Sequence, residues 1–558
     1  KMDFSRPRVG VPLGMTVRSF AGITPPVELR WLRSEGTARM KWDVVSLMPT
    51  YSPAVADREH WLKCEATDAL GVWAGRDFFF SRLPVFYLST DDGKAPTAQR
   101  EEHTGHLYAQ GNEAWKSPYE GVMTIKVRGN STAGYAKKPW KIKLDEKAKM
   151  FGIPKSKHWV LLANYLDPTQ MRDKLAYDFA NEIGQLGMKS TWVECVLNGE
   201  WQGCYLFCEH LRIAQNRVDI FDWEEEAEAR GIEGGDKDFS WVDPSVDDLS
   251  GGYLFEFDYR DDERSKFTLS SGNLKGLLTK VVSPEYLSSN PTMMTWCQDY
   301  LQNYFDACTS FDGTAAGRHY SEYCDVDSMV SYFLVMEMCG NWDARSLSRF
   351  AYKDRGKLLK FGPVWDFDYD MGNPERTAFE RRDPERWLVN DDVKNAPYSF
   401  YKEWADDPWF CTLLWTAYPA ARAKFVEMIA KIDEHAAYLS EAGEANARKW
   451  PRATGTFTSS IAILKAFLTK RLAWMDRQFR DVPTLMASLR KVADEAGTPS
   501  THPYSADVAT LPLAFVNAPA GTLREGQSLK LAFALGDVRV ADRARRNRPA
   551  AGPAGRRT

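Results

Sequence analysis

The two residues best suited to catalysis are a pair of aspartates that lie 23 positions apart. Asp343 follows an apolar helical segment, and Asp366 follows two strand-like runs that turn at Asp354-Arg355-Gly356. A carboxylate beside a hydroxyl can orient it and accept its proton, and a second carboxylate can hold a divalent ion between phosphates. The spacing therefore indicates phosphoryl transfer. The alternative is that Asp343 caps a helix and Asp366 closes a turn.

The order of these residues resembles that of protein kinases, in which a loop aspartate, a metal-binding asparagine, a hairpin and a second aspartate follow one another. Five positions after Asp343 this chain has Ser348 in place of the asparagine. A hydroxyl is a shorter and weaker ligand than an amide carbonyl, so Asp368, Asp370 or a water would have to complete the coordination. Oxygen ligands of this kind suit Mg²⁺ or Mn²⁺.

A series of further motifs resembles the CotH (spore-coat protein H) kinase family and spans roughly residues 84–480. In chain order the motifs are Arg128-Gly129-Asn130-Ser131-Thr132, 137–144, Phe151-Gly152, 159–164, Met171-Arg172, 198–203, 205–209, Asn216-Arg217-Val218, 251–258 and 362–368. The resemblance implies a divergent protein-kinase-like fold. It also implies transfer of the ATP γ-phosphate to serine or threonine hydroxyls of acceptor proteins.

Individual roles follow from this resemblance. Asp343 matches the catalytic-loop aspartate and Asp366 the metal-binding aspartate, with Ser348 and Asp368 as further candidate ligands of Mg²⁺ or Mn²⁺. Another set would bind ATP through its phosphates or position the group that does: Arg128, Asn130, Ser131, Lys138, Lys141, Lys143, Glu209 and Glu256. We expect one of the three lysines to contact the phosphates, and Glu209 or Glu256 to position that lysine or the nucleotide. Lys141 and Lys143 share one strand face and Lys138 lies on the other.

The elements that must position these residues indicate an α+β chain with three parts. Residues 1–83 alternate in short strand-like runs, which predicts an all-β immunoglobulin-like sandwich with Trp42 as a candidate core residue. Residues 84–484 form the predicted kinase-like domain, with strands first and helices later. Residues 485–558 are predicted to be a linker and an incomplete or disordered C-terminal β segment.

Within the kinase-like part, each element has a local signal. An Asn198-Gly199 pair predicts a hairpin over 191–209, and apolar spacing after Pro168 predicts a helix over 168–184. Residues 222–247 are acidic and polar, which predicts an exposed insertion. Further strands are expected at 122–129, 138–145 and 251–259 and as a pair near 348–364, and further helices at 293–306, 325–340 and 404–480.

Composition excludes some functions. The net charge is −4, which does not indicate a nucleic-acid partner, and no apolar run is long enough to predict a transmembrane segment. The sequence begins at Lys1 without a leader, and the resemblance places the protein outside the cytoplasm, secreted or at the cell surface. No CxxC pair occurs, which argues against structural zinc. Cys195 and Cys204 could form a disulfide or remain buried thiols.

Two other functions compete with the kinase hypothesis. One is a carbohydrate-active hydrolase that uses Asp343, Asp366 or Asp368 as acid and nucleophile. The other is a non-catalytic surface or adhesion protein built on a kinase-like scaffold, which Ser348 favours. The kinase hypothesis predicts ATP and serine-containing proteins as partners, and Arg128, one lysine, Asp343 and Asp366 around a single cleft.

Overall fold

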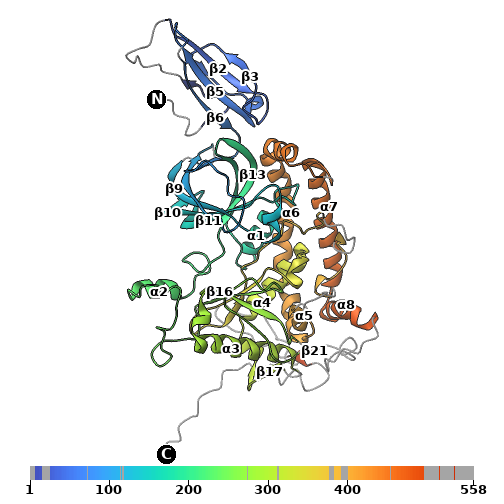
Figure 1. Cartoon of the computed structure of the whole chain (residues 1–558). Helices are drawn as coiled ribbons and strands as arrows, with labels where there is room; N and C mark the ends of the chain where they lie inside the picture. The colour runs from blue at the N-terminus through green and yellow to red at the C-terminus, as the bar shows by residue number, and fades with distance from the viewer. Residues whose placement is uncertain are drawn as a thin grey trace, which may run out of the picture.

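The computed structural model describes residues 7–14, 26–71, 73–112, 115, 118–272, 274–310, 313–375, 382–390, 400–452, 454–495, 514–515 and 533–534. These residues form a mixed α+β structure, which confirms the predicted class. Figure 1 shows a small sheet at one end, a barrel below it, and a second sheet with most of the helices beyond the barrel.

The small N-terminal sheet has four antiparallel strands in the order β3-β2-β5-β6. Its strands are β2 (Glu28–Ser34), β3 (Trp42–Ser46), β5 (His60–Thr67) and β6 (Trp73–Phe80), and β1 (Leu13–Gly14) pairs with β4 (Thr50–Tyr51) beside it. Trp31 on the inner strand β2 is completely buried, whereas Trp42 is partly exposed on the edge strand β3. The prediction that Trp42 is the core tryptophan is therefore wrong, because an edge strand covers less of its own side chains.

The next seven strands close into a barrel in the order β10-β11-β13-β12-β7-β8-β9, with β9 paired to β10. They are β7 (Val85–Thr90), β8 (His103–Gln110), β9 (Tyr119–Val127), β10 (Trp140–Met150), β11 (Ile153–Leu162), β12 (Ser190–Leu197) and β13 (Glu200–Glu209). The hairpin predicted over 191–209 is confirmed. Asn198 and Gly199 both have positive φ, as a tight two-residue turn requires. Along β10, Trp140, Ile142 and Leu144 fill the barrel core, so the intervening lysines face outward.

Helix α1 (Arg172–Glu182) follows β11 and begins four residues later than predicted. The side chain of Asp167 explains the delay, because it accepts hydrogen bonds from the backbone N–H groups of Thr169, Met171 and Arg172 at 2.9, 3.0 and 2.9 Å. These bonds hold residues 167–171 in a turn and satisfy N–H groups that have no partner inside the helix.

A second sheet supports the region of the two candidate aspartates. Its order is β15-β16-β14-β19-β20, formed by β14 (Tyr253–Phe257), β15 (Lys266–Thr268), β16 (Leu278–Ser283), β19 (Arg349–Lys353) and β20 (Leu359–Phe361). The strand predicted at 251–259 and the strand pair near 348–364 are thus confirmed. Because β19 and β20 form a hairpin, Asp343 before it and Asp366 after it return to the same end of the sheet.

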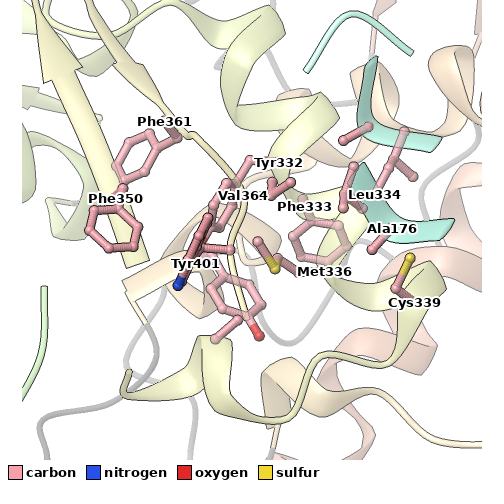
Figure 2. Packing of buried hydrophobic residues seen from close by; sticks show 14 of the residues in the cluster. Ala176, Tyr332, Phe333, Leu334, Met336, Cys339, Phe350, Phe361, Val364 and Tyr401 are labelled. Atoms are coloured by element: carbon pink, nitrogen blue, oxygen red, sulfur yellow. The ribbon is translucent and has the colours of Figure 1, made fainter. Parts of the chain in front are cut away.

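Helices pack against this sheet and enclose the largest core. They are α3 (Pro291–Thr309), α4 (Val326–Cys339), α5 (Phe400–Ala405), α6 (Pro408–Lys449), α7 (Phe457–Gln478) and α8 (Val482–Glu495). Figure 2 shows Tyr332, Phe333 and Met336 of α4 in this core, together with Phe361 of β20 and Tyr401 of α5. Among the described residues, no helix is both long and apolar enough to cross a membrane.

Three predictions outside these elements have different outcomes. The insertion 222–247 is only partly exposed, because α2 (Trp223–Ala229) buries Trp223, whose indole N–H donates to the Gly251 carbonyl at 3.0 Å. Residues 485–495, predicted to belong to a linker, are instead the C-terminal part of α8, which continues to Glu495. Beyond it the structure describes a short pair, β21 (Ala514–Phe515) with β22 (Phe533–Ala534), and the rest of 485–558 lies outside the described residues.

The cysteines resolve the alternative that the sequence left open. All nine lie in described segments, all are buried, and no disulfide joins any of them. Cys195 and Cys204 are not opposite one another, because Cys204 pairs with Glu194 in the ladder between β12 and β13.

Candidate active site

A cleft of about 460 Å³ lies between the barrel and the second sheet. Its walls come from the β9–β10 connection, the start of β10, the loop after β11, the first turn of α1, and the segment 343–368. The predicted site residues that line it are Arg128, Asn130, Ser131, Lys141, Glu256, Asp343, Ser348, Asp366 and Asp368. Segments that are more than 200 residues apart in the chain therefore meet around one space.

Three predicted residues do not line the cleft. The Lys138 ammonium donates to the Ala133 carbonyl at 2.8 Å, and Lys143 is exposed on the outer face of the barrel. Glu209 is 2% exposed, accepts a hydrogen bond from the Lys189 N–H at 2.9 Å, and lies 3.8 Å from Arg217. Of the three candidate lysines, Lys141 is the one that lines the cleft.

Asp366 has a backbone conformation that few residues adopt. Its φ is 68°, in the left-handed region, and the φ of Ser348 is 51°. The Ser348 hydroxyl donates to Asp366 Oδ2 at 3.2 Å, and the Asn341 amide donates to the Asp366 carbonyl at 3.2 Å. A left-handed non-glycine residue costs on the order of 1 kcal/mol or more and persists where its surroundings fix it, which is frequent in active sites.

Asp343 lies in a single helical turn immediately after α4, which ends at Gly340 in the left-handed conformation. The Asn341 side chain accepts a hydrogen bond from the Ala344 N–H at 2.8 Å, and the Asp343 carbonyl accepts one from the Leu347 N–H at 2.7 Å. These bonds fix the turn, so the half-buried Asp343 side chain stands at the cleft wall on a rigid backbone.

A further carboxylate that the sequence did not predict, Asp173, also lines the cleft. It lies in the first turn of α1, is 3% exposed, and accepts a hydrogen bond from the Phe367 N–H at 2.8 Å. Burial, together with the charge of Asp366, raises the pKa of Asp173 to about 7. Burial and the same neighbour raise the pKa of Asp368 well above its usual range. A signal was present, because Asp173 directly follows the Met171-Arg172 motif.

A buried ion pair fixes these carboxylates relative to one another. Arg172 and Asp167 are both fully buried and paired, and the Arg172 guanidinium also donates to the Asp370 carbonyl at 2.9 Å. The Asp370 carboxylate accepts a hydrogen bond from the Trp342 N–H at 3.1 Å. The start of α1, the segment 366–370 and the turn that carries Asp343 are therefore linked by direct hydrogen bonds.

The cleft lining also includes cationic side chains, among them Arg128 and Lys141. Burial, and then the positive charges of Lys126, Arg212 and Arg128, lower the pKa of Lys141 to about 8. Burial and the nearby Lys141 charge hold the pKa of His210, which also lines the cleft, well below its usual range. A site that disfavours further positive charge in this way is suited to bind an anion.

Two further cleft residues are held by partners within the protein. Lys137 is 1% exposed and donates to the Ala163 carbonyl at 2.7 Å, to Gln170 Oε1 at 3.3 Å, and to the Cys204 carbonyl. Glu256 accepts a hydrogen bond from Lys280 at 3.2 Å, and burial raises its pKa to about 7. Glu256 therefore pairs with Lys280 rather than with the candidate lysines, and the Lys137 ammonium is held by three acceptors of the barrel and the segment after β11.

The carboxylates of the cleft could hold a divalent ion only together with ligands from outside the protein. Within the described segments, no three or more His, Cys, Asp or Glu side chains are grouped so that they could hold a metal by themselves. Asp366, Asp173 and Asp368 nevertheless repel one another at one end of the cleft, and a cation there would relieve the repulsion. Such a site would take its remaining ligands from phosphate oxygens and water, as Mg²⁺ sites commonly do.

Comparison with protein families gives a match that covers most of the chain. The family described as CotH kinase protein matches residues 125–475, which is more than half of the chain. No curated protein matches the sequence.

Proposed function

Because the chain belongs to the CotH kinase protein family, we propose that it transfers the γ-phosphate of ATP to serine or threonine hydroxyls of acceptor proteins. One observation carries the proposal. The cleft is lined both by the carboxylates Asp366, Asp173 and Asp368 and by the cations Arg128 and Lys141. Phosphoryl transfer requires both charges in one space, because a polyphosphate is bound while a hydroxyl is activated.

In this proposal Asp343 orients the acceptor hydroxyl and accepts its proton. The hydroxyl oxygen forms a bond to the γ-phosphorus, the bond from that phosphorus to the bridging oxygen of ADP breaks, and ADP leaves with the electron pair. The turn that carries Asp343 is fixed by the hydrogen bonds of Asn341 and Leu347. The carboxylate is thus held in place before the hydroxyl arrives, which reduces the reorganisation that transfer requires.

The divalent ion would be held by Asp366 with Asp173 or Asp368, and we propose Mg²⁺ or Mn²⁺. When bound, it would neutralise charge that accumulates on the phosphates during transfer. Ser348 could contribute its hydroxyl, which already contacts Asp366 at 3.2 Å. The Phe367 N–H holds the Asp173 carboxylate at 2.8 Å, so two of these carboxylates are oriented before any ion binds.

Arg128 and Lys141 would contact the phosphates, with the backbone of residues 129–131 beside them. The Arg128 guanidinium lies 5.2 Å from the centre of the Trp365 ring, which directs it toward the end of the cleft that carries Asp366. Gly129 is required here, because its φ is +84° and a Cβ would come within 2.1 Å of Thr132 Oγ1. We propose that this backbone approaches the phosphates closely.

The remaining parts of the proposal concern the whole chain. We propose a divergent protein-kinase-like domain over 84–484 and an immunoglobulin-like sandwich over 1–83, of which the four-stranded sheet with β1 and β4 beside it is the described part. We also propose that the protein acts outside the cytoplasm, secreted or at the cell surface. The family resemblance supports this location.

A non-catalytic scaffold is the second candidate, and one contact favours it. Ser348 occupies the position of a metal-binding asparagine, and its hydroxyl donates to Asp366 Oδ2. A carboxylate oxygen that accepts this bond has one lone pair fewer for a cation. In a scaffold, the Ser348–Asp366 contact would replace the metal site.

The deciding experiment measures phosphate incorporation into serine-rich acceptor proteins from labelled ATP with Mg²⁺ or Mn²⁺. We expect incorporation by the wild type and a loss of at least about 100-fold in Asp343→Asn, which keeps the size of the side chain and removes its basicity. Asp343→Asn should still bind ATP, whereas Asp366→Ala should lose metal-dependent binding. If the wild type transfers no phosphate with either metal, the scaffold function replaces the kinase function.

A further inference from the structure

Two buried glutamates face each other where the N-terminal sheet meets the barrel. Glu59 immediately precedes β5 and is 4% exposed, and Glu194 lies in β12 and is fully buried. Each carboxyl has one oxygen with a donor from its own part of the molecule. The Ser81 hydroxyl donates to Glu59 Oε1 at 2.7 Å, and the Trp201 indole N–H donates to Glu194 Oε2 at 2.7 Å.

The second oxygen of each carboxyl group shows what kind of contact Glu59 and Glu194 can make. Glu59 Oε2 and Glu194 Oε1 are buried and receive no hydrogen bond from any donor among the described residues. The two carboxyl groups lie within hydrogen-bonding reach of each other. Two ionised carboxylates are both acceptors and would repel each other at such a contact, whereas one shared proton would join them.

We propose that Glu59 and Glu194 form a proton-binding site that fastens the N-terminal sheet to the barrel, and that loss of the shared proton weakens this junction. The proposal is independent of the kinase function. It concerns residues 81–84, which connect the N-terminal sheet to the barrel, and the side chains that pack around this connection.

The apolar surroundings of Glu59 and Glu194 make it unfavourable for both carboxyl groups to be ionised at once. Apolar side chains from both parts form one cluster around the pair, including Trp61 and Phe79 of the sheet and Val196 and Trp201 of the barrel. The Phe79 and Trp201 rings stack with centroids 5.6 Å apart. With Glu59 only 4% exposed and Glu194 fully buried, water solvates two ionised carboxylates poorly here, and an unpaired buried charge is strongly unfavourable.

The charged groups that face the pair do not remove this cost. Arg58 faces Glu59 but pairs with Glu441 of α6 at 2.8 Å. Lys137 faces Glu194 from the barrel side, yet its ammonium already donates to three acceptors.

The thiols facing Glu194, those of Cys195 and Cys204, are buried, and burial raises their pKa well above its usual range. The remaining charges line the pocket of about 700 Å³ beside Glu59, where α6 contributes Glu444, Arg448 and Lys449 and the sheet contributes His60.

The backbone indicates that Glu59 is held in place for this contact. Its φ is 61°, in the left-handed region that glycine adopts more readily, and its N–H donates to the Phe80 carbonyl at 2.7 Å. A glutamate in this conformation costs about 1 kcal/mol or more relative to a relaxed backbone. The contact with Glu194 offers a reason for that cost.

The direction of the pH dependence follows from burial. Burial raises the pKa of Glu59 to about 7 and that of Glu194 well above its usual range. Groups whose pKa is raised in the folded state contribute stability at low pH and lose it as the pH rises through the raised value. The junction is therefore tightest under acidic conditions and loosens as the pH rises above neutral.

Hydrogen exchange of the full chain tests the proposal without any activity assay. The reporters are peptides that contain Phe79, whose N–H donates to the Tyr87 hydroxyl across the junction at 2.8 Å, and peptides that contain Glu194. From about pH 6 to about pH 9, we expect their protection, corrected for intrinsic exchange, to fall about tenfold or more in the wild type. Glu194→Gln should abolish this fall, because its amide N–H can donate to Glu59 at every pH.

A second variant and a control make the result decisive. Glu59→Gln places the amide on the other member of the pair, where it can donate to Glu194 at every pH, so this variant should also remove the pH dependence. It provides the same test if Glu194→Gln does not fold. Glu444→Gln changes a carboxylate of the neighbouring pocket that lies outside the pair and should behave like the wild type. Protection in the wild type that does not change with pH, or an equal fall in the folded glutamine variants, would overturn the proposal.

Discussion

Single residues of the site were predictable where their signal is local. Asp343 and Asp366 could be identified because both lie beside one hairpin, so their spacing in the sequence is also their relation in space. Asp173 could not be assigned, since its role depends on α1 packing against residue 367, almost 200 positions away. Among the lysines, the shared face of Lys141 and Lys143 was predictable, whereas Lys138 precedes β10 and lies on neither face, and the choice of Lys141 required the position of the strand in the barrel.

Ser348 gives the sharpest test at this scale. We expect Ser348→Asn to lower the metal concentration needed for half-maximal phosphate incorporation by about threefold to tenfold, because an amide carbonyl is a better ligand than a hydroxyl. The backbone favours this substitution, since Ser348 has a φ of 51° and asparagine is among the residues that tolerate the left-handed region best.

Ser348→Ala is the matched control. It removes the hydroxyl that donates to Asp366 Oδ2 at 3.2 Å and adds no ligand, so the metal requirement should rise or stay the same. If both variants show the same metal dependence, residue 348 does not contribute to metal binding, and Asp173 and Asp368 remain the candidates.

Elements were predictable where periodicity and turn residues specify them. The hairpin at Asn198-Gly199 and the helix α4 after Asp325 have such signals, and both form as expected. The start of α1 was misplaced because the Asp167 side chain caps a turn that apolar spacing does not reveal. Closure of the barrel was not predictable either. It depends on the parallel pairing of β7 with β12, which are about 100 residues apart.

The two tryptophans of the N-terminal sheet test the core assignment at the level of the element. Trp31→Ala should lower the free energy of unfolding of this sheet by about 3–5 kcal/mol, because it leaves a cavity beneath an inner strand. Trp42→Ala on the edge strand should cost about 1 kcal/mol. Urea denaturation followed by exchange of β5 amides measures both, and equal losses would contradict the assignment of Trp31 as the core residue.

For the whole molecule, the sequence indicated the class and the order of the parts but not their contacts. One such contact is the ion pair of Glu337 in α4 with Arg471 in α7, at 2.9 Å and fully buried. Glu337 also accepts hydrogen bonds from the N–H groups of Leu388 and Val389, at 3.0 and 2.7 Å. Neither partner has a local signal, since both would read as surface charges on amphipathic helices.

Removal of this pair should therefore destabilise the assembly of helices. Glu337→Ala leaves Arg471 buried without its partner, and we expect a loss of about 3–5 kcal/mol in the free energy of unfolding. The control is Glu385→Ala, which breaks the exposed pair with Arg477 and should cost less than about 1 kcal/mol. Thermal unfolding of both variants provides the comparison, and similar melting temperatures would contradict a central role for the buried pair.

Helix α6 has a mechanical consequence. It runs unbroken from Pro408 to Lys449, roughly 60 Å at the usual rise per residue (Figure 1). At its start the Asp407 carboxylate accepts a hydrogen bond from Tyr320 at 2.6 Å, and just past its end the Trp450 indole donates to the Gln202 carbonyl in the barrel at 2.8 Å. The helix, which contains Pro419, therefore connects the region of Tyr320 with the barrel through contacts at its two ends. A wide hinge motion between these two regions would break one of the contacts, so in the proposed kinase we expect nucleotide to enter and leave by local movement of the loop at residues 129–135.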